Sequence, residues 1–258
     1  MSTYLAVGSV CWDVVDGSDE RRLGGSVLFA SRVARAAGWD ARIVTSGTAE
    51  LEATLAAELP DVELVVQRSP VDTVMAFPVD ADHGPRAVPT RASAIDEAGL
   101  DLRADVVHLA PIMGEVTREV VDAAAGAPFT GITPQGLLRT LGPADELQRR
   151  DALGTWWAAA VDAAVVSEAE FAVIDDRAAL ADLALAITRG ERGCIGRRGN
   201  TLVDLPGIGL HAVSPERTIG AGDVFAAAWF LALASGSAFA DALDHANRTA
   251  AAHVGAEP

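Results

Sequence analysis

Short apolar runs alternate with longer amphipathic stretches along most of the chain. Helices are predicted for residues 24–38, 50–59, 116–125, 152–160, 178–183, 221–235 and 238–254. Strands are predicted for residues 4–10, 42–45, 62–66, 105–110, 128–132, 163–166, 184–188, 193–197 and 201–205. Strands that alternate with helices in this way predict a doubly wound α/β fold with a mostly parallel sheet covered on both faces.

One segment, residues 71–91, departs from this alternation. Its few apolar positions flank a polar stretch at residues 80–84, which predicts a β-hairpin that projects from the body. An exposed surface hairpin and a cover over a binding site both fit this pattern. Because no linker, repeat or low-complexity stretch interrupts the chain, residues 1–258 are predicted to form a single domain with this hairpin inserted.

Charge excludes several classes of function. The net charge is −16, with 36 acidic against 20 basic residues, so nucleic acid and anionic membranes are not expected as partners. All the basic residues are arginines, and the sequence contains no lysine. A Walker A loop, a protein kinase site and a Schiff-base site each need a lysine, so phosphate chemistry here must rely on arginine, backbone amides and metal.

Neither cysteine nor histidine spacing indicates a metal site or a disulfide framework. Cys11 and Cys194 are far apart and belong to no C-x-x-C pair. The histidines lack metal-ligand spacing and are expected to be packed or exposed: His83, His108, His211, His245 and His253. The chain starts directly in a strand pattern without a leader, and its apolar runs are too short to span a membrane, which predicts a cytoplasmic protein.

The candidate chemistry centres on residues 217–223, which read R-T-I-G-A-G-D and precede an apolar helix. A glycine turn that opens a helix leaves unpaired N–H groups, which with the helix dipole form an anion site. Asp223 is placed where a carboxylate can take a proton from an incoming hydroxyl, so the pair suggests phosphoryl transfer. The alternative is a core helix opened by glycines, with Asp223 as an ordinary cap.

Further polar and glycine motifs follow other predicted strands and therefore fall on the same rim of the sheet. Asp13 and the pair Gly24-Gly25 follow the first strand, and residues 188–193 read as a tight turn or as part of a nucleotide site. Residues 167–170 fit a serine N-cap followed by acids; alternatively, Glu170 holds Mg²⁺ through water. Gly190, Gly193 and Gly196 are followed by no helix, so they do not form a dinucleotide fingerprint.

In their order and spacing these motifs resemble the ribokinase-like (PfkB) carbohydrate kinase family over nearly the whole chain. Residues 218–223 are similar to the end of its D-T-x-G-A-G-D motif, and residues 188–193 match its T-x-G-x-x-G turn. Leu23-Gly24-Gly25 resembles its N-terminal glycine pair, and residues 167–170 stand where it carries N-x-x-E. The resemblance implies a lid over the site, formed by residues 12–23 and 71–91. A homodimer formed through this lid is an open alternative.

The resemblance also implies an ATP- and Mg²⁺-dependent kinase that acts on a hydroxyl of a sugar, polyol or nucleoside. By this resemblance Asp223 is the base, and the amides of Gly220, Ala221 and Gly222 stabilise the charge on the transferred phosphoryl group. The resemblance places Thr188, Gly190, Gly193 and Asn247 at the nucleotide. It places Asp13, Gly24 and Gly25 at the acceptor, and Glu170 at the metal ion.

The sequence departs from the family pattern at three positions. Arg217 replaces the aspartate that opens the last motif and is itself suited to pair with a phosphate of the cofactor. Ser167 replaces asparagine, and Phe29 replaces an asparagine near the acceptor. Residues 7–14 and 135–139, the latter including the acceptor candidate Arg139, look closest to inositol-kinase-like members.

Two alternatives to this kinase remain open. The changes at Arg217 and Ser167 favour a ligand-binding or regulatory protein that kept the fold and lost turnover. A kinase with a phosphorylated sugar as acceptor needs arginines in its acceptor pocket, for which the candidates are Arg86, Arg91 and Arg139.

Overall fold

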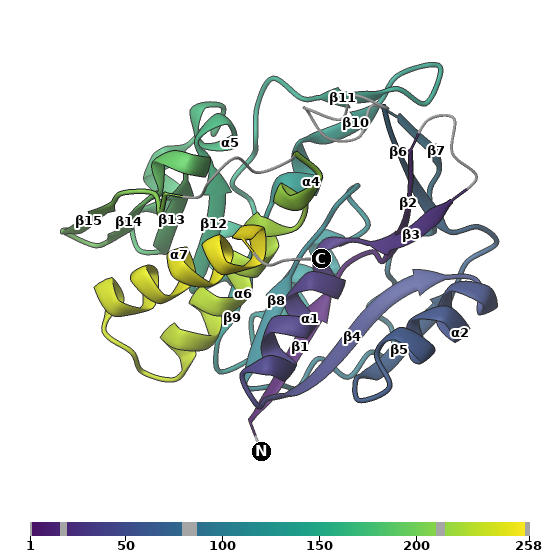
Figure 1. The fold of residues 1–258 in the computed structure, drawn as a ribbon, viewed down its shortest axis with the longest axis horizontal. Coiled ribbons are helices and arrows are strands. Elements are labelled where there is room, and N and C mark those ends of the chain that lie inside the picture. Colours follow the sequence, from purple (N-terminus) through teal and green to yellow (C-terminus); the bar gives the residue numbers. More distant parts are fainter. Residues whose placement is uncertain (1, 16–19, 79–86, 210–214, 256–258) are drawn as a thin grey trace.

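A nine-stranded sheet runs through the centre of the computed structural model, which describes residues 2–15, 20–78, 87–209 and 215–255 (Figure 1). From edge to edge the strands are β15 (Thr201–Leu205), β14 (Cys194–Arg198), β13 (Ala184–Thr188), β12 (Ala163–Ser167), β9 (Thr130–Ile132), β8 (Val106–Leu109), β1 (Thr3–Val7), β4 (Asp40–Gly47) and β5 (Glu63–Arg68). The run from β13 to β5 is parallel, whereas β14 and β15 extend it antiparallel. The predicted fold class is confirmed.

Helices cover both faces of this sheet. One face packs against α1 (Ser26–Ala36), α2 (Ala49–Glu58), α6 (Ala221–Ala234) and α7 (Phe239–Gly255). The other face packs against α3 (Arg118–Ala124) and the 3₁₀ turns η1 (Ala158–Ala160) and η2 (Arg177–Leu180). In β1, Tyr4 and Ala6 face the first layer while Leu5 and Val7 face the second, which is why the strand is apolar throughout. α6 is buried from Val224 to Leu231, so it reads as apolar on all sides.

Two predicted helices are wrong. Residues 152–160 and 178–183 contain only the single turns η1 and η2. Few side chains are buried in these segments, namely Leu153, Trp157 and Ala158 in the first and Leu180 and Leu183 in the second. Alanine-rich segments this short do not sustain a helix, because its first turn is costly to form without packing along its length.

The helix α5 (Glu168–Ala172) and the turn η3 (Gly190–Arg192) lie where the sequence predicted a helix start at residues 167–170 and a tight turn at residues 188–193. Several other short elements near the site were not predicted. They are the helix α4 (Gln135–Leu138), the hairpin strands β10 (Arg139–Leu141) and β11 (Leu147–Arg149), and the turn η4 (Pro215–Thr218). Their polar, short segments carry no helical or strand period. All of them lie at loops that follow strands, so they shape the rim of the sheet.

A second sheet of four strands stands beyond this rim, in the order β3 (Arg21–Gly24), β2 (Cys11–Val15), β6 (Thr73–Phe77) and β7 (Ala87–Thr90) (Figure 1). β6 and β7 form the predicted antiparallel pair, and its expected turn at residues 80–84 lies outside the described residues. We call these four strands the small sheet. Met75, Phe77 and Val88 pack with Ile112 and Met113 of the loop after β8, which joins the small sheet to the body.

The edge strand of the small sheet also contacts the β10–β11 hairpin. The Val88 amide donates to the carbonyl oxygen of Asp145 at 2.9 Å, and Ala87 forms an isolated bridge with Glu146. Asp145 has φ 59°, a left-handed conformation that an aspartate tolerates in a turn. One edge of the small sheet is therefore engaged by the protein's own hairpin.

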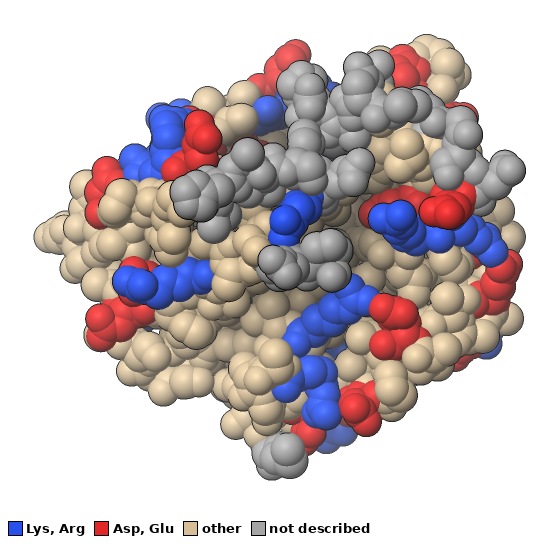
Figure 2. Space-filling view, in the orientation of Figure 1, with Lys and Arg blue, Asp and Glu red and all other residues tan. Residues whose placement is uncertain are grey.

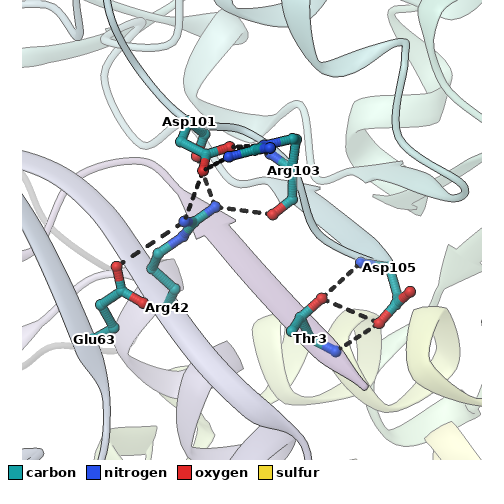
Figure 3. A network of polar contacts seen from close by, with 6 residues as sticks. All are labelled: Thr3, Arg42, Glu63, Asp101, Arg103 and Asp105. Atoms are coloured by element: carbon teal, nitrogen blue, oxygen red, sulfur yellow. Dashed lines mark hydrogen bonds and ion pairs between the residues drawn. The ribbon is translucent and has the colours of Figure 1, made fainter. Parts of the chain in front are cut away.

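The opposite end of the main sheet carries a polar network (Figure 3). The Thr3 amide donates to Asp105 Oδ2 at 2.8 Å, and Arg42 Nη2 donates to the carbonyl oxygen of Asp101 at 2.6 Å. Arg42 also forms an ion pair with Glu63 at 4.0 Å. These contacts tie the segment before β8 to β1, β4 and β5, at the end of the strands away from the small sheet.

Figure 2 shows arginine and acidic side chains intermixed on one face of the molecule. On this face, therefore, the side chains do not form the continuous basic surface that nucleic-acid binding requires. In the described part of the chain, no helix combines the length and apolarity needed to cross a membrane.

Candidate active site

Two cavities meet at the carboxyl ends of the main-sheet strands, beside the start of α6. One has a volume of about 290 Å³ and contains Asp13 and Asp223, so we call it the aspartate cavity. The other has a volume of about 700 Å³ and lies beside residues 188–193, so we call it the turn cavity. Thr188, Thr218 and Gly222 line both, which means that ligands in the two cavities would meet at the start of α6.

Asp223 lies in the first turn of α6, which begins at Gly220 with φ 80° and no side-chain cap. The amides of this first turn are thus left for a ligand, and the helix dipole favours an anion there. Burial raises the pKa of Asp223 to about 6, although a hydrogen bond from Ser26 and the charge of Arg139 oppose the rise. A carboxyl group with a pKa in this range is well suited to accept a proton near neutral pH.

Asp13 extends from β2 on the other side of the same cavity. Its carboxyl group packs against Gly24, where a Cβ atom would come within 2.1 Å of Oδ2. Cys11 Sγ donates to Oδ1 at 3.3 Å. Burial raises the pKa of Asp13 to about 6, with the Cys11 bond and the Arg139 charge acting against it.

The predicted pair Gly24-Gly25 has two separate roles. Gly24 gives room to Asp13 and is not part of the cavity lining, whereas Gly25 lines the aspartate cavity directly. Gly25 caps α1 with φ 104°, and a Cβ atom there would lie 2.4 Å from the carbonyl oxygen of Ser9. Only glycine fits this close approach between the start of α1 and the loop after β1.

Arg139 reaches the aspartate cavity from the start of β10. Its Nη1 donates to the carbonyl oxygen of Ile112 at 3.1 Å. Burial lowers the pKa of this guanidinium, while the charges of Glu170 and Asp223 oppose the shift. Arginine remains protonated under all ordinary conditions, so the cavity holds a fixed positive charge facing two carboxyl groups.

Glu115 was not predicted, although it organises the loops around this cavity. It is buried, and its carboxylate accepts from the amides of Ser9 at 2.7 Å, Ile112 at 2.9 Å and Met113 at 2.7 Å. Through these bonds it joins the loop after β1 to the loop after β8, whose Ile112 carbonyl holds Arg139. Its position soon after a predicted strand was the only signal in the sequence.

Ser167 and Glu170 form a capping box at the start of α5. The Ser167 amide donates to Glu170 Oε2 at 2.7 Å, and the Glu170 amide donates to Ser167 Oγ at 3.2 Å. The serine cap considered from the sequence is therefore present, and both residues also line the aspartate cavity. Among the described residues no group of three or more His, Cys, Asp or Glu side chains is arranged to hold a metal.

The turn cavity collects the residues expected at the nucleotide: Thr188, Gly190, Gly193 and Asn247. Gly193 has φ 88°, and a Cβ atom there would lie 2.1 Å from the carbonyl oxygen of Leu205. Asn247 Nδ2 donates to the carbonyl oxygen of Pro206 at 3.0 Å, so that part of its amide already has a partner. Ala221 lines this cavity and Gly220 lines the other.

Arg217 lines neither cavity. Its Nη2 atom is buried and has no hydrogen-bond partner within the part of the chain that the structure describes. Arg86 lies outside the described residues, and Arg91 is exposed and lines neither cavity. Of the arginines considered from the sequence, the structure brings Arg139 to the aspartate cavity.

The profile of the pfkB family carbohydrate kinases matches residues 148–257. This segment holds Asp223, the glycine turn, Glu170 and the turn at residues 188–193. The resemblance of the chain to the ribokinase-like carbohydrate kinases is confirmed. A comparison with curated proteins gave no match.

Solved structures extend the likeness over the whole chain. A pyrophosphate-dependent kinase in the ribokinase family, complexed with a pyrophosphate analog and myo-inositol, is 20% identical with a TM-score of 0.81, covering 97% of this chain and 94% of that one. A nucleoside kinase of Burkholderia thailandensis in complex with inosine is 17% identical with a TM-score of 0.75 over 99% and 92% of the two chains. Ribokinase from Thermotoga maritima is 17% identical with a TM-score of 0.72 over 98% and 92%.

These structures share the ribokinase fold from end to end, so the fold covers Asp13 and the glycine pair that the family profile does not reach. The carbohydrate kinase profile over residues 148–257 bears out the expected enzyme class, a phosphotransferase with an alcohol group as acceptor, and the solved structures show the fold. The molecules bound in these structures differ: a pyrophosphate analog and myo-inositol in one, and inosine in another.

Proposed function

We propose that the protein transfers the γ-phosphoryl group of ATP to a hydroxyl group of a sugar, an inositol-like polyol or a nucleoside. The observation that carries this proposal is the position of Asp223. It lies in a cavity large enough for a small polyol, at the uncapped start of α6, with a pKa raised to about 6. A base and an anion site at one helix terminus are the two requirements of this reaction.

In the proposed step the acceptor hydroxyl faces Asp223, and its proton passes to the carboxylate as the new O–P bond forms. The bond between the γ-phosphorus and its bridging oxygen breaks, and the electron pair stays on that oxygen of the departing ADP. Asp13 accepts hydrogen bonds from other hydroxyls of the acceptor and orients it. Met75 and Phe77 of the small sheet line the cavity, which supports a role of this sheet as a lid that excludes water.

The charge that develops on the transferred group is stabilised by groups of this chain. The amides of Gly220, Ala221 and Gly222 open α6, and Arg139 supplies a fixed positive charge. Mg²⁺, when bound with the donor, would neutralise phosphate charge. Such an ion takes most of its ligands from phosphates and water, so the single carboxylate of Glu170 at the cavity edge is compatible with it.

The turn cavity favours a nucleotide donor over pyrophosphate. Its volume is about 700 Å³ and its lining includes both the start of α6 and Asn247 of α7, which is more space than a second phosphate would occupy. Pyrophosphate is the second candidate, because three similar structures are named as pyrophosphate-dependent kinases. The test supplies ATP, GTP or pyrophosphate together with myo-inositol, ribose or inosine. Release of ADP or GDP identifies a nucleotide donor, and release of phosphate identifies pyrophosphate.

The test of the function is turnover of the wild type and of Asp223→Asn in this panel. General-base catalysis contributes about 100- to 10,000-fold, so kcat should fall by that range in the variant. The control is Asp122→Asn, which alters an exposed carboxylate on α3 and should leave kcat unchanged. A wild type that binds donor and acceptor by calorimetry but turns over no combination contradicts the proposal and supports the ligand-binding alternative suggested by Arg217 and Ser167.

Adding the monophosphate of each acceptor to this panel addresses the phosphorylated-sugar alternative. Arg139 already faces Asp13 and Asp223, so part of its charge is compensated within the cavity. We therefore expect a neutral polyol or nucleoside to be preferred over its monophosphate. Sedimentation of the same preparations tests whether the protein is a homodimer. The β10–β11 hairpin already engages one edge of the small sheet, which makes dimerisation through that edge less favourable.

A further inference from the structure

We propose that His253 is a positioning residue that fixes the direction of the Gly220 amide at the start of α6. This inference rests on the proposed function, because it assigns His253 a role in the same anion site. His253 lies in the last turns of α7, and its Nε2–H donates to the carbonyl oxygen of Ile219 at 2.9 Å. The bond joins the C-terminal helix to the residue directly before the anion site.

The geometry of the peptide unit explains why this bond matters. The carbonyl group of Ile219 and the amide of Gly220 belong to the same planar unit, in which the C=O and N–H bonds point in opposite directions. Holding the carbonyl oxygen toward His253 therefore directs the Gly220 N–H away from α7. Gly220 lines the aspartate cavity, so this amide belongs to the group proposed to stabilise the transferred phosphoryl charge.

Phe29 of α1 completes the support. Its ring meets the His253 ring edge to face, with centroids 5.7 Å apart and planes at 80°. The same ring lies against Gly220, where a Cβ atom would come within 2.6 Å of it. Phe29 thus orients the imidazole and blocks one side of the glycine, while the hydrogen bond holds the peptide from the other end.

Backbone conformation shows why such support is needed. Gly220 has φ 80° and starts α6 without a side-chain cap, and glycine is the residue with the greatest backbone freedom. Because Ile219 is 36% exposed, its side chain does not anchor the turn in the core. His253 and Phe29 therefore supply contacts that the turn residues themselves do not make.

Two substitutions separate the hydrogen bond from packing. His253→Gln keeps an N–H donor at about the reach of Nε2, and His253→Leu keeps bulk but removes the donor. Because misplacing a catalytic group by about 1 Å costs on the order of 100-fold, we expect kcat of His253→Leu to fall by about 10- to 100-fold, with the acceptor KM changed by less than about 3-fold. His253→Gln should stay within about 3-fold of the wild type.

His245→Leu is the matched control, since His245 lies on the same helix with an exposed side chain. Its kcat should equal that of the wild type. Both imidazole forms that carry a proton on Nε2 make the bond, so the loss in His253→Leu should persist at pH 9, where Asp223 is ionised. If His253 had only a structural role, both His253→Gln and His253→Leu would lower thermal stability and kcat together.

The inference is overturned if His253→Leu keeps the kcat of the wild type, or if the glutamine and leucine variants lose it equally. A wild type without turnover would instead count against the proposed function. A test independent of activity covers a wild type without turnover and a leucine variant that does not fold. It uses long-range ¹H–¹⁵N spectra of the wild type with ¹⁵N-labelled histidine. A proton on Nε2 of His253 at about pH 8 is expected, and an unprotonated Nε2 would overturn the assignment.

Discussion

Asp13 and Asp223 have raised pKa values for the same physical reason, and the same guanidinium limits the rise in both. Burial in the aspartate cavity is the largest cause for each, and the charge of Arg139 opposes it for each. The two carboxyl groups come from β2 and α6, which are far apart in the sequence. Arg139 therefore couples the residue expected to orient the acceptor with the residue expected to deprotonate it.

The first prediction is a fall in kcat/KM at acidic pH. Asp223 accepts a proton only when ionised, so activity should decrease as the pH falls through about 6 and level off above about pH 7. Since Asp13 titrates in the same range, the log–log slope below the midpoint should exceed 1. Initial rates between about pH 5 and pH 9 test this, and a flat profile from pH 5 to 7 would show that no base with a pKa near 6 limits the reaction.

The second prediction concerns stability. A carboxyl group whose pKa is higher in the folded state than in the unfolded chain favours folding only when protonated, so ionised Asp223 destabilises the fold above about pH 6. Asp223→Asn should therefore raise the free energy of unfolding at pH 8 by up to about 3 kcal/mol. The difference should vanish near pH 3, where the carboxyl group is protonated in both states.

Urea titrations of both proteins at the two pH values measure this difference. Asp122→Asn, whose carboxylate is exposed, should leave the free energy of unfolding unchanged at either pH. Equal stability of wild type and Asp223→Asn at pH 8 would show that the cavity does not desolvate this carboxylate.

The sheet was predictable because the physics that forms it is local. Strands buried on both faces read as continuous apolar runs, and α6 reads as an apolar helix opened by Gly220. Asp13 and Asp223 could be placed on one rim because the loops after parallel strands meet at one edge of a sheet. The alanine-rich segments that end in η1 and η2 were mispredicted, since composition favours helix there and only tertiary packing limits it to one turn.

Support for the site came from contacts that no local pattern encodes. Glu115 bonds to Ser9, and His253 bonds to Ile219, across separations of 106 and 34 residues. Neither residue stands in a motif, and each was indistinguishable from an ordinary packed or exposed side chain. Motif order located the residues expected to react, whereas the residues that hold them required the fold.

The third prediction tests Glu115. Replacing it by glutamine puts an amide group among three backbone donors, so at least one N–H loses its acceptor. The free energy of unfolding should fall by about 2–4 kcal/mol, as expected for buried hydrogen bonds to a charged group. The acceptor KM should rise, because the loops that carry Asp13 and the Ile112 carbonyl are no longer joined.

Thermal unfolding and steady-state kinetics of Glu115→Gln measure both effects. Glu97→Gln, which alters an exposed carboxylate, serves as the control and should match the wild type in each assay. Unchanged stability together with an unchanged KM would show that the Glu115 bonds do not organise the cavity.

The fourth prediction compares two glycines that flank α6 with nearly the same backbone conformation. Gly220 and Gly236 have φ 80° and 81°, so alanine at either position brings a similar strain of about 1 kcal/mol. A Cβ atom at Gly236 meets nothing within 4 Å, whereas one at Gly220 would press into the ring of Phe29. Gly236→Ala should therefore keep the kcat of the wild type, and Gly220→Ala should lose about 100-fold or more as its amide moves. Equal kcat in the two variants, measured at saturating donor and acceptor, would show that the direction of the Gly220 amide does not limit the reaction.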